Sequence, residues 1–155
     1  KQVATRLIEQ FKQRKPARVY AAIVAGVVST DTGSFHSHLA TGKSLERYVT
    51  RPSPTTELAI THYRVLRRMS DTTLVEVTLE TGKRNQIRVQ FANAEHPVLG
   101  DPRYKTELAM HPRWIRKRIA LHAKSLGFEH PISGDAMQIE SPLPSAIEKF
   151  LAGSR

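Results

Sequence analysis

The chain has 155 residues and a formal net charge of +10, with 39% hydrophobic residues, 25% charged residues and no cysteine. This composition predicts a soluble globular protein and excludes disulfides and thiolate metal sites. No apolar run approaches the ~20 residues of a membrane span, so no membrane partner is expected. The lack of cysteine fits a reducing, cytoplasmic address.

The positive charge is concentrated in two segments. Residues 1–18 carry six basic side chains against one acidic side chain, and residues 84–118 carry eight against three. The remaining residues are neutral in sum. Two basic segments on a neutral background suggest a surface that faces a polyanion. A solvated basic rim without a partner is the alternative.

The chain is predicted to begin with a helix and a buried strand. Apolar residues recur at helical spacing over residues 3–11, and Pro16 ends this helix. A buried strand is expected over residues 19–28, followed by a turn at residues 31–33. A short strand is expected over residues 35–39.

The middle of the chain is predicted to form a loop, a hairpin and a helix. Residues 41–56, with proline, glycine and many hydroxyl side chains, are expected to form the loop. Residues 59–65 and 75–79 alternate with period two, and the polar link at residues 70–72 predicts an antiparallel hairpin. Apolar residues spaced over residues 87–94 then indicate a helix.

The last third is predicted to contain a loop, two strands and a helix. Residues 96–117 contain three prolines and are expected to form mostly loop, with one short helix. Strands are expected around residues 119–129 and 136–140. A helix should follow, with a capping box formed by Ser145 and Glu148. The predicted fold class is α+β, a mostly antiparallel mixed sheet flanked by a few helices and long loops.

Residues 79–92, LETGKRNQIRVQFA, resemble the strand–turn–helix motif of RluA-type pseudouridine synthases, which usually reads Leu-x-Thr-Gly-Arg-x-His-Gln-Ile-Arg-Val-His. Four other segments resemble the same family in order and spacing. They are residues 17–26, 96–104, 118–123 and 128–134. With five segments in order, the chain is identified as a member of this family over about residues 1–152.

The resemblance implies a pseudouridine-synthase-like fold and the isomerisation of uridine to pseudouridine in ribosomal or transfer RNA. The reaction detaches uracil from C1′, turns the base and rejoins it through C5, and it needs no metal or organic cofactor. No obligate protein partner is inferred. The family's catalytic aspartate lies in an Arg-Leu-Asp-x-x-Thr-Ser-Gly-Leu motif upstream of the helix that corresponds to residues 1–12.

Nothing in this chain matches that motif. We therefore expect residues 1–155 to be a single domain, the C-terminal portion of a catalytic domain, and to be inactive alone. None of the four turn aspartates is expected to be the nucleophile: Asp31, Asp71, Asp101 and Asp135. With its partner missing, Arg88 is expected to be solvated or bound to an anion from the medium.

Arg88 and Tyr20 are the catalytic residues that the resemblance implies. Arg88 would pair with the missing aspartate, since a carboxylate enclosed in a pocket stays ionised only beside a cation. Tyr20 would stack on the target base, and Ile87 and Leu121 would line the substrate pocket. The alternatives are an ordinary surface ion pair for Arg88 and core packing for the other three.

Basic residues are expected to grip RNA phosphates without reading sequence. They are Arg14, Lys15, Lys83, Arg84, Arg113, Arg116, Lys117 and Arg118. Arg18, Asn85 and Gln90 replace a lysine and two histidines that the family favours, and these departures are expected to alter RNA contacts rather than the chemistry. The spacing of His36 and His38 suits two metal ligands, but no further ligand stands nearby and no metal is expected.

Two alternatives remain open. The first is a non-catalytic RNA-binding module that kept the fold and lost the nucleophile. An upstream aspartate motif in the reading frame would favour the enzyme, and a start codon at Lys1 would favour the module. The second is a basic DNA-binding domain, but no recognition helix, zinc finger or basic zipper pattern supports it.

Overall fold

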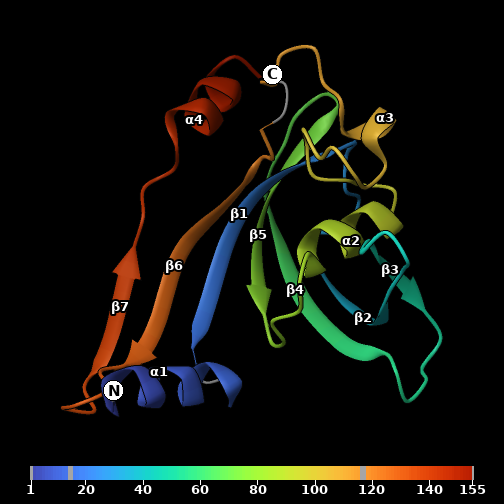
Figure 1. Cartoon of the computed structure of the whole chain (residues 1–155). Coiled ribbons are helices and arrows are strands. Elements are labelled where there is room, and N and C mark those ends of the chain that lie inside the picture. Colours follow the sequence, from blue (N-terminus) through green and yellow to red (C-terminus); the bar gives the residue numbers. More distant parts are fainter. Residues whose placement is uncertain (1, 14–15, 116–117, 155) are drawn as a thin grey trace.

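The structure, a computed structural model, describes residues 2–13, 16–115 and 118–154 (Figure 1). Its strands are β1 (Ala17–Ala25), β2 (Thr32–Thr41), β3 (Arg47–Thr50), β4 (Glu57–Arg68), β5 (Thr72–Leu79), β6 (Leu121–Glu129) and β7 (Ala136–Glu140). Its helices are α1 (Gln2–Lys12), α2 (Gln86–Asn93), α3 (Thr106–Ala109) and α4 (Ser145–Ala152). The strands form one sheet in the order β3-β2-β4-β5-β1-β6-β7, and each pair of neighbours is antiparallel. The predicted α+β class is confirmed.

Strand β1 lies inside the sheet, between β5 and β6, and supplies much of the core. Its residues 21–24 are all buried, which explains their uninterrupted apolar sequence. The strand ends at Ala25, three residues before the predicted end. Gly26 has a φ of +75°, and this left-handed conformation turns the chain out of the sheet.

The predicted hairpin is confirmed as β4 and β5. Tyr63 pairs with Val77 and Val65 with Val75, so the period-two apolar residues of both strands meet on one face. The backbone N–H of Met69 donates to the carbonyl of Thr72 at 2.9 Å and closes the turn. The hairpin places Leu79 at the edge of the candidate site described below.

The prediction of an unbroken loop over residues 41–56 is wrong, because β3 lies within it. Leu39 pairs with Val49 across β2 and β3, and β2 is longer than predicted at both ends. The guanidinium of Arg47, in β3, is largely buried and binds the carboxylate of Glu57 at 2.7 Å. Strand β3 was not predicted because its four residues begin with an arginine and contain too few apolar positions to show the period-two alternation of a strand.

Helix α2 lies across one face of the sheet, over β4 and β2 (Figure 1). Six of its eight residues are buried, as expected for a short helix that is covered almost all round. Phe91 is 1% exposed, and its ring lies 5.0 Å from that of Phe35 and 5.6 Å from that of Tyr63. Burial of an aromatic ring of this size contributes roughly 3–5 kcal/mol, so Phe91 anchors the helix.

Helices α1 and α4 lie at opposite ends of the sheet (Figure 1). None of the eleven residues of α1, all of which are described, is buried, and the helix contacts the β6–β7 turn through polar side chains. Arg6 donates to the carbonyl of Pro131 and Gln10 to that of Glu129, each at 2.8 Å. Within the described residues, no helix is long and apolar enough to cross a bilayer.

The predicted helix at the C-terminus is confirmed as α4, but its capping box is wrong. The N-cap residue is Pro144, and Ser145 is already the first helical residue. No side chain caps the helix. Ile147 and Phe150 are buried and hold α4 to the main core cluster, so packing rather than capping secures the helix.

Candidate active site

A pocket of about 180 Å³ lies where β1, β5, β6 and the start of α2 meet. Tyr20 and Leu121 come from neighbouring strands, since Tyr20 pairs with Ala123 and Ala22 with Leu121. Residues 20 and 22 of β1 share a face of the strand, so Tyr20 and Leu121 line the pocket from the same side of the sheet. The complete lining is Tyr20, Leu79, Lys83, Asn85, Gln86, Ile87, Arg88 and Leu121.

The turn that precedes α2 is held by a buried glutamine. The side-chain oxygen of Gln86 accepts hydrogen bonds from the Thr81 hydroxyl and the Lys83 backbone N–H, at 2.8 and 2.9 Å. Its amide nitrogen donates to the carbonyl of Ile60 at 3.0 Å, which ties the turn to β4. Asn85 precedes the helix with a φ of +57°, a conformation that asparagine tolerates better than most residues. The bonds of Gln86 fix the start of α2 and so set the position of Arg88, two residues after Gln86.

Arg88 lies at the pocket wall in a two-pronged ion pair with Asp101. Its Nε donates to one carboxylate oxygen at 2.7 Å and its Nη2 to the other at 2.9 Å. Its Nη1 donates to the side-chain oxygen of Asn85 at 3.0 Å, and its Cζ lies 5.1 Å from the centre of the Tyr104 ring. The hydrogen bond with Asp101 raises the pKa of Arg88, against the lowering effect of burial.

The expectation that Arg88 would be solvated or bound to an outside anion is wrong. Asp101 lies in the loop after α2, and this loop turns back onto the helix through Gly100, which has a φ of +74°. A side chain at Gly100 would collide with the backbone carbonyl of Arg118, so the close approach requires glycine. A loop residue that meets a helix thirteen positions earlier leaves no periodic signal in the sequence.

Asp101 is fully buried, and its carboxylate is held entirely by donors. Besides Arg88, the backbone N–H groups of Arg103 and Tyr104 donate to its Oδ1 at 2.9 and 3.1 Å. Burial by itself raises the pKa of Asp101, but the bonds from Arg88 and from these two N–H groups outweigh it and hold the pKa below its ordinary value. The carboxylate side chain is 0% exposed and does not line the pocket, so it cannot reach a bound nucleoside.

The three residues that depart from the family motif, Arg18, Asn85 and Gln90, lie in different surroundings in the structure. Gln90 is 2% exposed and bonds to Thr61, Ser37 and the carbonyl of Ala59, so the expectation that it alters RNA contacts is wrong. Asn85 contacts Arg88 directly and therefore belongs to the site itself. The guanidinium of Arg18 lies close to Gly82, in the turn before α2.

Three of the predicted phosphate-binding side chains have partners within the protein. Lys83 binds Glu57 at 2.8 Å, and hydrogen bonds from Lys83 and Arg47 hold the pKa of Glu57 below its usual value. Arg84 donates to the carbonyl of Leu45 at 2.8 Å. Arg113 donates to Gly153 and Ser154 at the end of α4 and lies over the Phe150 ring.

Of the other five residues predicted to bind phosphate, only Arg118 lies within the described residues. Arg118 is exposed, and its backbone carbonyl accepts a bond from the indole N–H of Trp114. Arg14, Lys15, Arg116 and Lys117 lie outside the described residues. On β2, His38 bonds to the Thr56 hydroxyl at 3.0 Å, and the ring of His36 faces His62 on β4.

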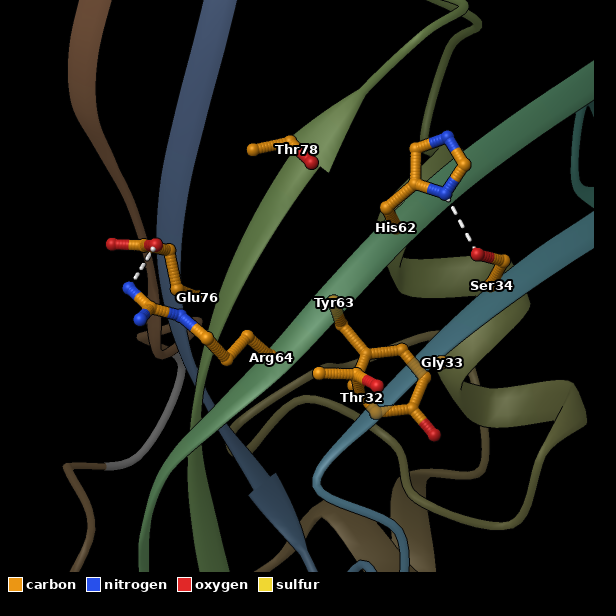
Figure 2. Close-up of a pocket in the computed structure, with 8 residues that line it drawn as sticks. All are labelled: Thr32, Gly33, Ser34, His62, Tyr63, Arg64, Glu76 and Thr78. Atoms are coloured by element: carbon orange, nitrogen blue, oxygen red, sulfur yellow. Dashed lines mark hydrogen bonds and ion pairs between the residues drawn. The ribbon is translucent and has the colours of Figure 1, made fainter.

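A larger, polar pocket of about 420 Å³ lies on the other face of the β2-β4-β5 part of the sheet. Figure 2 shows its two bonded pairs, Ser34 with His62 at 2.7 Å and Arg64 with Glu76 at 2.9 Å. Four of its side chains are bonded in these two pairs, and it contains none of the residues singled out by the family motif. We therefore take the smaller pocket beside Arg88 as the candidate active site.

A family model described as RNA pseudouridylate synthase matches residues 1–93, more than half of the chain. The chain belongs to the RNA pseudouridylate synthase family. The expected family resemblance is thereby confirmed. One relative, the uncharacterized RNA pseudouridine synthase YlyB of Bacillus subtilis, is 35% identical and matches 96% of this chain and 48% of that protein. Ribosomal large subunit pseudouridine synthase D of Pseudomonas aeruginosa is 36% identical and matches 95% of this chain and 47% of that protein.

Solved structures of this family share the fold. Human RNA Pseudouridylate Synthase Domain Containing 4 superimposes with a TM-score of 0.76 at 22% identity, over 96% of this chain and 66% of that one. Human RNA Pseudouridylate Synthase Domain Containing 1 does so with a TM-score of 0.77 at 18% identity, over 96% and 69%. The chain spans about half the length of the curated relatives that it matches.

Proposed function

We propose that this chain is the C-terminal portion of the catalytic domain of an RNA pseudouridine synthase, and that its pocket receives the uridine to be isomerised. One observation carries the proposal: Tyr20, Ile87, Arg88 and Leu121 come from three separate elements and line a single pocket. Family membership supports it, and so does the match to about half of each curated relative.

In the proposed complex the target uridine leaves its stack and enters the pocket, at a cost of roughly a few kcal/mol. The ring of Tyr20 offers a face on which uracil stacks, and Ile87 and Leu121 provide apolar walls that exclude water. Apolar walls would also raise the pKa of a carboxylate brought into the pocket. Arg88, at the same wall, keeps such a carboxylate ionised.

The proposed reaction breaks the bond from N1 to C1′ and forms a bond from C5 to C1′. C5 then loses its proton and N1 gains one, so that uridine and pseudouridine have the same atoms. The nucleophilic carboxylate that assists this exchange comes from a segment outside these 155 residues. Asp101 does not fill that role, because its carboxylate is 0% exposed and four donors already hold it.

Ribosomal RNA of the large subunit is the first substrate to test, since the Pseudomonas aeruginosa relative is named for it; transfer RNA is the second. Either substrate would place the activity in the cytoplasm. Arg84 and Arg118 are exposed and suited to phosphate contacts, which position RNA without reading its sequence. No obligate protein partner is part of the proposal.

One observation favours a second candidate, a non-catalytic RNA-binding module. Arg88 finds a carboxylate partner within the chain, so its charge is already neutralised without a nucleophile. A protein that had lost catalysis would tolerate this arrangement. The two candidates differ in one outcome, because both bind RNA and only the enzyme forms pseudouridine.

The test uses the full-length natural protein that carries this chain, incubated with large-subunit ribosomal RNA and with transfer RNA transcripts. Pseudouridine is measured by mass spectrometry of the digested RNA. We expect pseudouridine in one of the two RNAs, and a loss of at least about 100-fold in rate for Arg88→Gln. The control is Arg64→Gln, which removes an exposed guanidinium on the other face of the sheet and should leave the rate unchanged.

Binding of RNA without pseudouridine would support the RNA-binding module and overturn the enzyme. A full rate for Arg88→Gln would overturn the assignment of the pocket beside Arg88, whatever the enzyme's substrate.

A further inference from the structure

The two side chains of the Asp101–Arg88 ion pair differ in their exposure to solvent. The carboxylate of Asp101 is 0% exposed, whereas the guanidinium of Arg88 is 18% exposed and lines the pocket. Asp101 does not line the pocket. The arginine therefore stands between a buried carboxylate and the open space in which a nucleoside would bind.

The hydrogen bonds of Arg88 leave part of its guanidinium available. A guanidinium carries five N–H groups. Asp101 takes one from Nε and one from Nη2, and Asn85 takes one from Nη1. Two N–H groups, one on each Nη, have no partner among the described residues. Because the pair with Asp101 runs side-on through Nε and Nη2, the unused N–H groups of Nη1 and Nη2 remain able to donate to a second carboxylate.

We propose that Asp101 is a positioning residue that fixes the guanidinium of Arg88 from behind, so that its remaining N–H groups meet the nucleophilic carboxylate. This inference rests on the proposed pseudouridine synthase function and deepens it. Asp101 touches neither substrate nor nucleophile, and acts through Arg88 alone. Its own position is secured by the backbone N–H groups of Arg103 and Tyr104, which fold the loop around it.

The pair also sets the charge that the nucleophile meets. Alone, Arg88 would present a full positive charge and lower the pKa of a neighbouring carboxylate strongly. Paired with Asp101, it presents good hydrogen-bond donors with little net charge, so the lowering is weaker. Among the described residues, Tyr104 from the loop lies beside the guanidinium, and the pocket wall adds Tyr20 from β1 and Lys83, which is neutralised by Glu57.

Two substitutions at Asp101 in the full-length protein distinguish its effect on the position of Arg88 from the effect of its charge. Asp101→Asn keeps the size of the side chain and removes its charge, so Arg88 loosens and regains its full charge. We expect kcat to fall about 10- to 100-fold with KM little changed, since a displaced catalytic group costs rate rather than binding. The acid limb of the pH–rate profile should move to lower pH, because removing a negative charge lowers the pKa of the nucleophile.

Asp101→Glu keeps the charge and displaces the carboxylate. It should lower kcat as well but leave the acid limb where it is in the wild type. Glu95→Gln is the matched control, because it removes an exposed carboxylate paired with Lys105 and should change neither quantity. Suppose that the rate of Asp101→Asn falls only by the fraction of protein that fails to fold, and that the acid limb of its pH–rate profile does not move. That result would overturn the inference and leave the proposed function intact. Absence of pseudouridine in the wild type would instead remove the proposed function.

If neither Asp101 variant folds, the wild-type protein supplies the test. With arginine labelled by ¹⁵N, the Nε–H of Arg88 should exchange with solvent at least ~10-fold more slowly than that of exposed Arg64. It should also keep this protection from pH 5 to pH 8, since neither partner titrates there. Exchange of the Arg88 Nε–H as fast as that of Arg64 would show that Asp101 does not hold the guanidinium, and would sink the inference.

Discussion

The hydroxyl of Thr61 donates a hydrogen bond to the side-chain oxygen of Gln90 at 2.6 Å and so joins the middle of β4 to α2. Both residues are buried, at 0% and 2% exposure. The amide nitrogen of Gln90 donates to Ser37 on β2 and to the carbonyl of Ala59 on β4. One side chain thus ties the site's helix to two strands.

Gln90→Ala is therefore expected to destabilise the protein by about 2–4 kcal/mol, because it leaves buried polar groups without partners and opens a cavity. The free energy of unfolding in urea measures this loss. Gln138→Ala, at an exposed position of β7, is the matched control and should change the unfolding free energy by less than about 0.5 kcal/mol. Equal losses of unfolding free energy in the two variants would show that the hydrogen bonds of Gln90 add nothing to stability.

Glu76 joins three strands through two ion pairs. It binds Arg64 on β4 at 2.9 Å and Lys124 on β6 at 2.7 Å, and the bond to Lys124 spans β1, which lies between β5 and β6. Hydrogen bonds from Lys124 and Arg64 hold the pKa of Glu76 below its ordinary value, against the raising effect of burial.

Because this pKa is lowered in the folded state, its contribution to stability is present above the ordinary value of 4.5 and is lost as the pH falls below it. Glu76→Gln should cost about 1 kcal/mol at pH 7, with partners as exposed as these. The difference from wild type should shrink as the pH falls below 4.5. Urea unfolding at pH 7, 4.5 and 3 measures it, and a difference that stays constant over this range contradicts the assignment.

Arg113 and Arg118 are expected to differ in what they do for the protein. Arg113 holds the end of α4 through Gly153 and Ser154 and covers the ring of Phe150, so Arg113→Ala should lower the unfolding free energy by about 1–2 kcal/mol. Arg118→Ala should leave stability unchanged and reduce the slope of log affinity for RNA against log salt by about one. Filter binding across a salt series, together with urea unfolding, distinguishes the two roles. The reverse pattern would return Arg113 to the phosphate-binding surface.

The 155-residue chain, expressed by itself, is expected to form no pseudouridine in RNA that the full-length protein modifies. Within the described residues the carboxylate nearest to Arg88 is that of Asp101, and it is buried away from the pocket. Mass spectrometry of digested RNA measures the product. Detectable pseudouridine from the isolated chain would contradict this prediction and require a nucleophile within these residues.

Much of the fold was predictable from the sequence because its elements are local. The period-two residues of β4 and β5, the turn between them and the apolar spacing of α2 each depend on a few neighbouring positions. The family motif over residues 79–92 likewise named the pocket residues of α2, since a helix start holds Ile87 and Arg88 at fixed places. Strand β3 was missed because four residues with one buried arginine show no pattern.

The sequence by itself determined the family, the antiparallel character of the sheet and four of the residues that line the pocket, because motif and periodicity are properties of neighbouring residues along the chain. Only the tertiary structure decided which charges meet. Asp101 folds back onto Arg88, Arg113 holds the end of α4, and Gln90 bonds to two strands rather than facing RNA. A buried polar group takes whichever partner the packing brings within about 3 Å, and no local pattern in the sequence records that choice.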